Sequence, residues 1–205
     1  MSDGASIRDS FTTLAAPAYG IYKVKGSKHH GYVFPIAQED EVGDHLRDIR
    51  KKHHDARHHA LAYRIGLAGD VWRTSDDGEP NNSAGPPILG AFKSREITNC
   101  LGIVVRYFGG TKLGVGGLID AYRTATLCAL ENAQLVEQIL FSEFALSFSY
   151  ELIGVVMNHL DKWGATPQEQ IFLESCSINV KIRMSHAAAF ESATREIYGV
   201  NLEES

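Results

Sequence analysis

The stretch from Cys100 to Leu130 constrains the fold more than any other part of the chain. It begins with a short apolar run, passes through Arg106, Tyr107 and Phe108, and reaches a bend with five glycines in nine positions before a second apolar segment. Glycine loses more backbone entropy on folding than other residues, so this density indicates a need for positive φ or close backbone approach. The pattern predicts a buried strand, a glycine-rich bend and a helix.

The glycine-rich bend, which starts at Gly109 and Gly110, predicts an anion-binding site. A strand, a bend and a helix start aim several backbone N–H groups at one point, and Arg106 and Lys112 flank that point. The spacing matches neither a G-x-x-x-x-G-K-[ST] phosphate loop nor a G-x-G-x-x-G dinucleotide fingerprint. The alternative is that the glycines only let the helix and strand pack closely.

Composition restricts the class of protein. A chain of 205 residues with 44% hydrophobic and 22% charged residues is typical of one or two soluble globular domains with a sizeable core. No apolar run approaches the roughly 18 residues of a membrane span, and residues 1–17 lack the apolar segment of a secretory signal. Three widely spaced cysteines without a C-x-x-C pair are typical of buried thiols in a reducing compartment. We therefore expect a cytoplasmic protein without membrane contact.

Charge is divided unevenly along the chain. Up to Leu140 there are 16 Lys and Arg against 16 Asp and Glu, whereas from Phe141 onward there are 4 against 9, a difference of −5. Because phosphate binding needs local positive potential, any nucleic-acid surface is expected in the N-terminal part.

The hydrophobic pattern predicts two α+β domains, over residues 1–138 and 139–205. Residues 1 to about 17 are expected to form a loosely held terminus. The elements expected next are strands over 19–25 and 32–36, a helix over 39–52, strands over 60–65 and 71–74, and a short helix over 88–93. After the central strand and helix come strands over 143–150, 170–173, 176–184 and 200–202, with helices over 152–163 and from Ser185, as helix cap, to Gly199. This last β-α-β-β-α order predicts a small ferredoxin-like domain with a final edge strand.

The first candidate site is the acidic loop formed by Asp76, Asp77 and Glu79. Three carboxylates in four positions suit a hard cation, or could raise one another's pKa for acid–base chemistry. The alternative is a solvated turn in which the aspartates accept hydrogen bonds from backbone groups.

Two further sets of residues accompany the acidic loop. His54 and His58 have a spacing that a zinc site can use, but no H-E-x-x-H motif or third ligand is evident, so no metal is predicted. His58 is the histidine most favoured to face a cleft. The other set suits a nucleotide or phosphate and consists of Arg106, Tyr107, Phe108, Lys112 and Arg123. Its alternative is that the aromatic residues belong to the core and Arg106 bridges to the acidic loop.

Taken together, the motifs resemble the IMPACT/YigZ family over nearly the whole chain. The matching segments are Gly26-Ser27-Lys28, Ala56-Arg57-His58, Ala62-Tyr63-Arg64, the Ser-Asp-Asp-Gly-Glu-Pro run at 75–80, residues 84–89 and residues 104–118. The chain departs from the family pattern at His29, at Asn82-Ser83, and at Asp120, which stands where an arginine is usual.

The resemblance implies an N-terminal domain folded like the second domain of a small-subunit ribosomal protein, and a ferredoxin-like C-terminal domain resembling the last domain of elongation factor G. It implies a non-enzymatic cytosolic factor, without cofactor, linked to regulation of translation through RNA, ribosome or translation-factor contact. Sequence-specific DNA binding is not expected. The predicted groove is lined by Arg106, Lys112, His58 and the acidic loop. Two alternatives stay open: a metal-assisted hydrolase or phosphate-handling enzyme that uses the acidic loop with His58, and a protein–protein interaction module.

Overall fold

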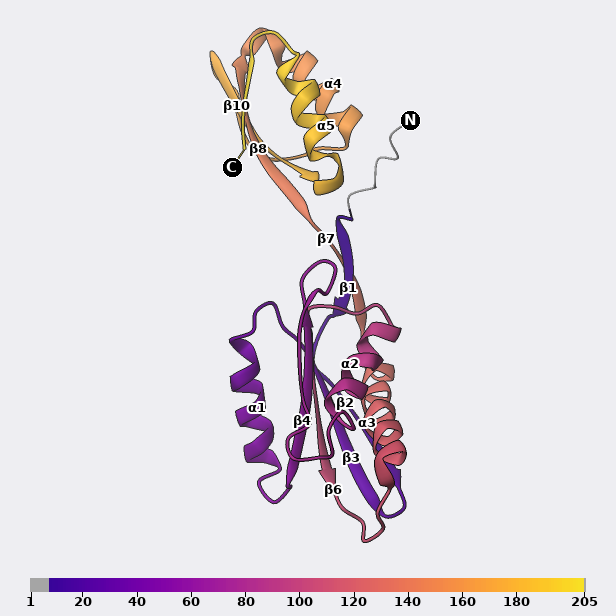
Figure 1. The fold of residues 1–205 in the computed structure, drawn as a ribbon. Coiled ribbons are helices and arrows are strands. Elements are labelled where there is room, and N and C mark those ends of the chain that lie inside the picture. Colours follow the sequence, from indigo (N-terminus) through magenta and orange to yellow (C-terminus); the bar gives the residue numbers. More distant parts are fainter. Residues whose placement is uncertain (1–7, 205) are drawn as a thin grey trace, which may run out of the picture. The chain divides into compact units, whose positions relative to one another are not determined.

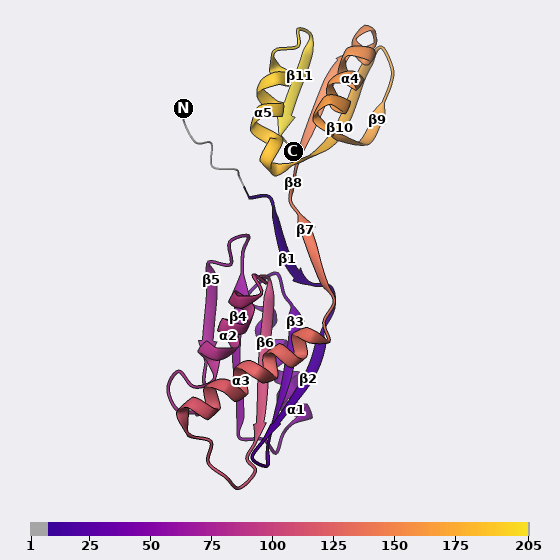
Figure 2. The same cartoon turned by 90° about the vertical axis from the view of Figure 1, so that its right-hand side faces the viewer.

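The computed structural model describes residues 8–204 and divides into two compact units. The first unit is Phe11–Gln138, and the second joins residues 8–10 with residues 139–204 (Figures 1 and 2). Asp9 belongs to the second unit because its carboxylate accepts hydrogen bonds from Arg183 (Nε 3.0 Å, Nη2 2.8 Å).

The first unit is built around a five-stranded antiparallel sheet. Its strands, in spatial order, are β2 (Ala18–Val24), β3 (Ser27–Pro35), β6 (Cys100–Tyr107), β4 (His58–Ile65) and β5 (Val71–Ser75). One face is covered by α1 (Glu41–Lys52), and the other by α2 (Gly85–Ser94) and α3 (Gly114–Glu131), as Figure 1 shows. A separate two-stranded sheet pairs β1 (Ser10–Leu14) with β7 (Leu135–Ile139). The predicted central strand and following helix are thus confirmed.

Side chains alternate along β6 and supply a core on each face of the sheet. Val104 is buried in the cluster that includes Tyr122 of α3, whereas Ile103 and Val105 are buried in the cluster that includes Ile49 of α1. Because the side-chain period of a strand is two, Arg106 follows Val104 onto the α3 face, and Tyr107 follows Val105 onto the α1 face. At its end, β6 therefore places the guanidinium of Arg106 and the phenol of Tyr107 on opposite faces of the sheet.

The second unit is a four-stranded antiparallel sheet with two helices on one face, as Figure 2 shows. Its elements along the chain are β8 (Phe141–Ser149), a 3-10 turn (Tyr150–Leu152), α4 (Ile153–Trp163), β9 (Thr166–Ile171), β10 (Ser175–Arg183), α5 (Met184–Arg195) and β11 (Val200–Glu204). The spatial order is β11-β8-β10-β9. Alternation along β10 buries Cys176, Ile178, Val180 and Ile182 against the helices, as its sequence pattern predicts.

Several sequence-based boundaries were wrong. The terminus is not loose from residue 8 onward, because β1 pairs with the unpredicted β7 and buries Phe11 and Leu14. β3 begins at Ser27 rather than residue 32, since Lys25 and Gly26 turn tightly with φ of 45° and 79°. Ser185 does not cap α5; its hydroxyl donates to Asp9 Oδ2 (2.5 Å).

Two smaller shifts affect other elements. β9 occupies Thr166–Ile171, whereas the expected strand covered 170–173. α2 begins at Gly85 rather than residue 88, for a reason found in the acidic loop below. Within residues 8–204, no helix is both long and apolar enough to cross a membrane.

Candidate site at the end of the central strand

Three side chains lie in one row across the end of the sheet. β3 pairs with β6 so that His29 is opposite Arg106, and β4 pairs with β6 so that His58 is opposite the same arginine. Directly paired residues in adjacent strands share a face, so both histidines flank Arg106 on the α3 side.

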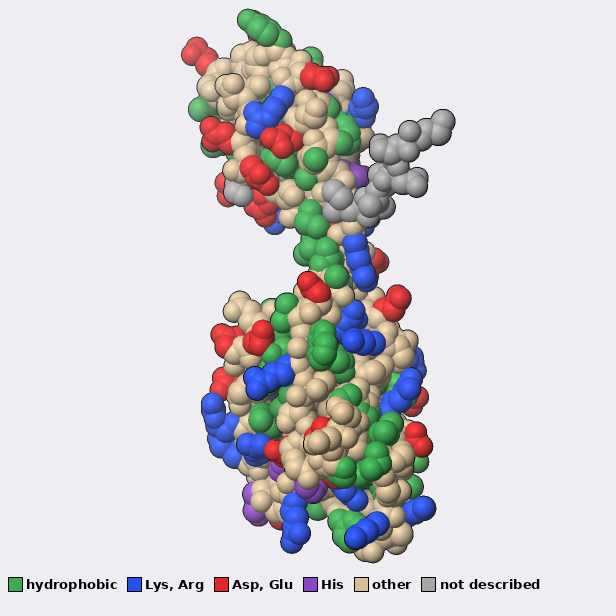
Figure 3. Space-filling view, in the orientation of Figure 1, with side chains coloured by type: hydrophobic (Ala, Val, Ile, Leu, Met, Phe, Trp, Pro, Cys, Tyr) green, Lys and Arg blue, Asp and Glu red, His purple; other side chains and the backbone are tan. Residues whose placement is uncertain are grey.

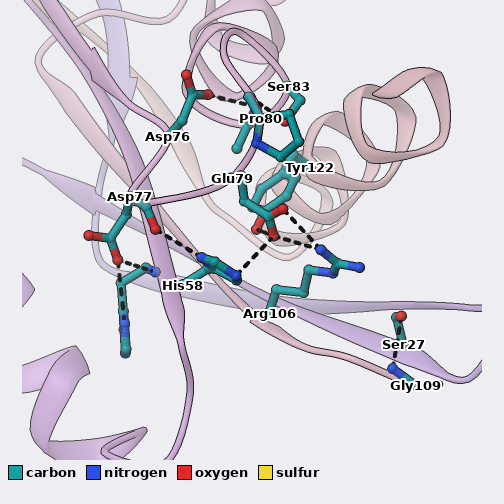
Figure 4. Close-up of polar contacts among 12 residues, drawn as sticks. Ser27, His58, Asp76, Asp77, Glu79, Pro80, Ser83, Arg106, Gly109 and Tyr122 are labelled. Atoms are coloured by element: carbon teal, nitrogen blue, oxygen red, sulfur yellow. Dashed lines mark hydrogen bonds and ion pairs between the residues drawn. The ribbon is translucent and has the colours of Figure 1, made fainter. Parts of the chain in front are cut away.

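The acidic loop meets this row through Glu79, as Figure 4 shows. Arg106 Nη1 donates to both carboxylate oxygens of Glu79 (2.8 and 3.0 Å), and Tyr122 Oη donates to Oε1 (2.8 Å). Only 3% of the Glu79 side chain and 9% of the Arg106 side chain is exposed. Burial, and then the Glu79 charge, raises the pKa of Tyr122, so its phenol stays a hydrogen-bond donor. The charge of Arg106 is therefore compensated inside the protein.

His29 is the most deeply buried member of the row. It has no exposed surface, and its ring meets that of Tyr122 edge to face with centroids 5.3 Å apart. Among the described residues, neither ring nitrogen has a partner with good hydrogen-bond geometry. Burial, followed by the charge of Arg106, lowers the pKa of His29 to about 4, so the ring is neutral at pH 7.

Asp76 holds the start of α2. Its Oδ1 accepts backbone N–H groups of Ala84 and Gly85 (both 2.9 Å), and its Oδ2 accepts that of Asn82 (2.8 Å). The first N–H groups of a helix lack intrahelical partners, and a carboxylate there stabilises them. This contact from outside the helix explains why α2 starts three residues earlier than its own sequence indicates.

Asp77 fixes the orientation of His58. Its Oδ2 accepts the backbone N–H of His59 (2.7 Å), its Oδ1 accepts from Arg50 (3.1 Å), and its carbonyl oxygen accepts from His58 Nδ1 (2.9 Å). Because a carbonyl can only accept, His58 carries its proton on Nδ1. His58 Nε2 then lies 4.0 Å from Glu79 Oε1. The three carboxylates of the acidic loop thus bond to protein groups. The two aspartates accept backbone N–H groups, as the turn alternative expects, but the loop is not a solvated turn, because Glu79 is buried and bonds to side chains.

A pocket of about 530 Å³ opens beside this network. It is lined by Asp55, Ala56, Arg57, His58, Arg106, Tyr107, Phe108 and Lys112. The predicted residues Arg106, Lys112 and His58 therefore share one pocket, whereas no acidic-loop residue is among its lining residues. We call it the cationic pocket. Within residues 8–204, no carboxylate forms an ion pair with Arg57 or Lys112, so these two carry the uncompensated charge.

A second pocket of about 490 Å³ adjoins the first. Its lining residues are Gly26, Lys28, His30, His53, Tyr107 and Phe108, so both pockets share the last two, which we call the aromatic ridge. Tyr107 is anchored: its hydroxyl donates to Asp55 (2.7 Å) and lies 3.0 Å from His53 Nδ1. Burial, and then the Asp55 carboxylate, raises the pKa of Tyr107 to about 12. Phe108 is instead 59% exposed, with the Arg106 guanidinium 5.6 Å from its ring centre.

The two candidate glycines, Gly109 and Gly110, have different structural roles. Gly109 donates its N–H to Ser27 Oγ (3.1 Å), and a Cβ on Gly109 would lie 1.8 Å from the carbonyl carbon of Gly26. Gly110 has a φ of 91° and no neighbour that a Cβ would meet within 4 Å. The close approach at Gly109 favours the alternative in which the glycines allow tight packing. Gly110 instead provides the positive φ that the bend needs.

Sequence reasoning missed several members of the site. It assigned no role to Arg57 or Lys28 beyond their place in family motifs, and it gave Tyr122 no part in the site. Arg57 and Lys28 could have been found from their neighbours in the sequence, because Arg57 directly precedes His58 and Lys28 directly follows Ser27. Arg123 lines neither pocket. Among residues 8–204, no group of three or more His, Cys, Asp or Glu could hold a metal ion.

Fold and site together define a class of protein: an α+β chain of two units whose first unit carries a cationic pocket and an exposed aromatic ridge at one end of its sheet. The model of the Impact N-terminal domain matches residues 25–130, which contain every residue lining the two pockets. This chain belongs to the IMPACT family.

Individual relatives extend this match beyond the first unit. YvyE of Bacillus subtilis is 32% identical over 187 residues, covering 91% of this chain and 86% of the relative. YigZ of Escherichia coli is 32% identical over 153 residues, covering 72% of this chain and 74% of the relative. A solved structure titled "Crystal structure of an hypothetical protein" has a TM-score of 0.65 at 25% identity and covers 95% of this chain and 96% of its own.

Proposed function

We propose that this chain is a non-enzymatic cytoplasmic factor that binds RNA through the cationic pocket and acts in the regulation of translation. The observation that carries the proposal is the charge arrangement at the pocket. Arg57 and Lys112 have no ion-pair partner among the described residues, while the three carboxylates of the acidic loop bond to protein groups. Exposed cations beside aromatic rings suit phosphate and base contacts.

The distribution of charge supports the same surface. Figure 3 shows Lys, Arg and His side chains gathered at the end of the first unit where β6 terminates. The single acidic side chain lining the pocket, Asp55, accepts the Tyr107 hydroxyl and keeps its negative charge, so Arg57 and Lys112 together still leave the lining net positive. Phosphate contacts dominate nucleic-acid affinity, so cations that are not neutralised in the free protein suit such a ligand.

The fold offers support by analogy only. The strand order β11-β8-β10-β9 with two helices on one face favours a ferredoxin-like domain over 139–205, comparable to the last domain of elongation factor G. The N-terminal domain predicted over 1–138, which contains the first unit (Phe11–Gln138), is proposed to correspond to the second domain of a small-subunit ribosomal protein. Both domain types recur in RNA-binding proteins, which is an argument from fold and not from the site.

The test is salt-dependent binding of ribosomal RNA between 50 and 200 mM KCl by filter binding. The double variant Arg57→Ala/Lys112→Ala is expected to bind about tenfold more weakly and to lower the slope of log affinity against log salt by about 1.5, since each lost phosphate contact removes roughly 0.7–0.9. Arg106 is avoided, because removing it would leave Glu79 buried without its partner.

The matched control is Arg47→Ala/Lys51→Ala on α1. This control removes the same charge from exposed side chains that pair with Asp44 and Asp48. The control should change the logarithm of the affinity by less than half as much as Arg57→Ala/Lys112→Ala does. If the wild-type chain fails to bind RNA at 50 mM KCl, or if both double variants weaken binding equally, the proposal is wrong.

A further inference from the structure

We propose that the RNA bound at this site is single-stranded, that one of its bases stacks on Phe108, and that the strand crosses the aromatic ridge from the cationic pocket into the second pocket. This inference rests on the proposed function and specifies its ligand. It follows from the exposure of Phe108, from the two pockets that share the ridge, and from the cations on both sides of it.

Phe108 is built as an open aromatic platform. Its neighbour Tyr107 is held by Asp55 and His53, whereas Phe108 leaves 59% of its surface in contact with water. The guanidinium of Arg106 lies over the ring at 5.6 Å, and Glu79 holds that guanidinium in place from the other end. The Arg106 guanidinium thus lies beside the ring while more than half of Phe108 stays exposed, which leaves aromatic surface for a base to stack on.

The pockets lie on both sides of this platform. Their volumes, about 530 and 490 Å³, fall in the range of small-ligand sites, so each has room for one nucleotide. Both include Tyr107 and Phe108 in their linings. A strand whose base covers the ridge therefore places its neighbouring nucleotides in the two pockets.

Both pockets are lined by cations that form no ion pair within residues 8–204. Arg57 and Lys112 line the cationic pocket, and Lys28 lines the second. Among the described residues, none of the three forms an ion pair. Phosphates on the 5′ and 3′ sides of the stacked base would each meet a cation. A peptide would supply such regularly spaced negative charge only if it were densely acidic.

A double helix does not fit this arrangement. Bases in a duplex are stacked on one another and paired, so they cannot cover an aromatic side chain without being unstacked. Duplex RNA would be left with phosphate contacts alone, and its binding would not depend on Phe108.

The experiment measures fluorescence anisotropy of a labelled 20-nucleotide oligouridylate and of a blunt ten-base-pair RNA duplex, which has nearly the same number of phosphates and no unpaired base, at 50 and 150 mM KCl. The wild-type chain is expected to bind the single strand at least tenfold more tightly. Phe108→Ala should lose about 5- to 160-fold of that affinity, the range of one base–aromatic stack. Phe108→Trp should retain the affinity for the single strand. Lys28→Ala should weaken binding of the single strand and make its affinity depend less on salt concentration.

Trp72→Ala is the matched control. Trp72 is 52% exposed on the edge strand β5 and lines neither pocket, so its removal should leave the affinity unchanged. Thermal melting by circular dichroism checks that each variant folds. Hydrogen–deuterium exchange with the oligonucleotide bound should protect the segment from Tyr107 to Lys112.

The outcomes separate the two proposals. If Arg57→Ala/Lys112→Ala weakens RNA binding but Phe108→Ala does not, or if the blunt duplex binds as well as the single strand, the inference is overturned and the proposed function stands. If no RNA binds at 50 mM KCl, both fail. If a purified translation protein binds and requires Phe108 while RNA does not bind, the ridge is a protein interface and both are overturned.

Discussion

Arg106 lies at the centre of the site, but its main bond is to the protein itself. The Arg106–Glu79 pair is almost fully buried, and the bond from Tyr122 adds a third member. Breaking such a pair by removing one partner costs about 3–5 kcal/mol, because the other charge is left in a medium of low dielectric constant. Arg106 therefore orders the end of β6, and the cations available to a ligand are Arg57 and Lys112.

His29 predicts a measurable pH dependence of stability. Its pKa is lowered from 6.5 to about 4 in the folded protein, so between these values the unfolded chain binds more protons than the folded chain. The free energy of unfolding should therefore fall as the pH drops from 6.5 toward 4, at up to about 1.4 kcal/mol per pH unit. Well above pH 6.5 the ring is neutral in both states, and this contribution becomes constant.

Urea unfolding at pH 7, 6 and 5 tests this prediction. His29→Phe keeps a ring against Tyr122 but cannot take up a proton, so its stability should decline less steeply than that of the wild type. His30, His53 and His59 also have lowered pKa values and titrate in both proteins, so only the difference between the profiles reports His29. Parallel profiles would contradict the assignment.

At the scale of elements, the glycine-rich bend connects β6 to α3 and also docks on the β2–β3 turn. Gly109 reaches Ser27, which is 82 positions away in the chain, through a backbone-to-side-chain hydrogen bond. The bend therefore sets where the aromatic ridge lies relative to Lys28. Close packing between the two turns explains why the first position of the bend is a glycine.

Gly109→Ala is expected to destabilise the first unit by more than about 1 kcal/mol, because the new Cβ would lie 1.8 Å from Gly26 and the two turns would have to separate. Gly116→Ala is the control. No atom lies within 4 Å of its added Cβ, and it sits in the first turns of α3, so alanine should be neutral or stabilising by up to about 1 kcal/mol. Thermal and urea unfolding measure both. Equal effects of the two variants would count against the close approach.

At the scale of the whole molecule, a few residues near the N-terminus belong to the second unit. The carboxylate of Asp9 accepts from Arg183 and Ser185, and its backbone carbonyl accepts the N–H of Leu140 (2.7 Å). The hydrogen bonds from Arg183 and Ser185 hold the pKa of Asp9 well below its usual range. The first and last parts of the sequence are thus joined within one unit.

Asp9→Ala is expected to lower the stability of the second unit and to leave the first unit unchanged. Because the pKa of Asp9 is lowered by folding, its contribution is present at neutral pH and is lost as the pH falls below its ordinary value of 3.8. Hydrogen–deuterium exchange should show faster exchange in β10 and α5 but not in β3 and β6. Asp161→Ala, on the exposed surface of α4, serves as control, and faster exchange in both units would contradict the prediction.

The sequence by itself determined the central strand, the glycine-rich bend, the following helix and most elements of both units, together with the family. These depend on local periodicity and on contiguous motifs, which can be read without knowing partners. It also placed Arg106, Lys112 and His58 as candidates for one groove, a site that stays a prediction until binding is measured.

Only the tertiary structure decided what each of these residues does. Strand register places His29 and His58 beside Arg106, and a loop 27 positions before Arg106 provides its carboxylate partner. Local pattern cannot specify such pairings, because a shift of one residue in register would move every side chain to the opposite face of the sheet. The burial of Glu79, the anchoring of Tyr107 and the exposure of Phe108 therefore follow from long-range packing, and they are what separates the structural arginine from the cations left free for a ligand.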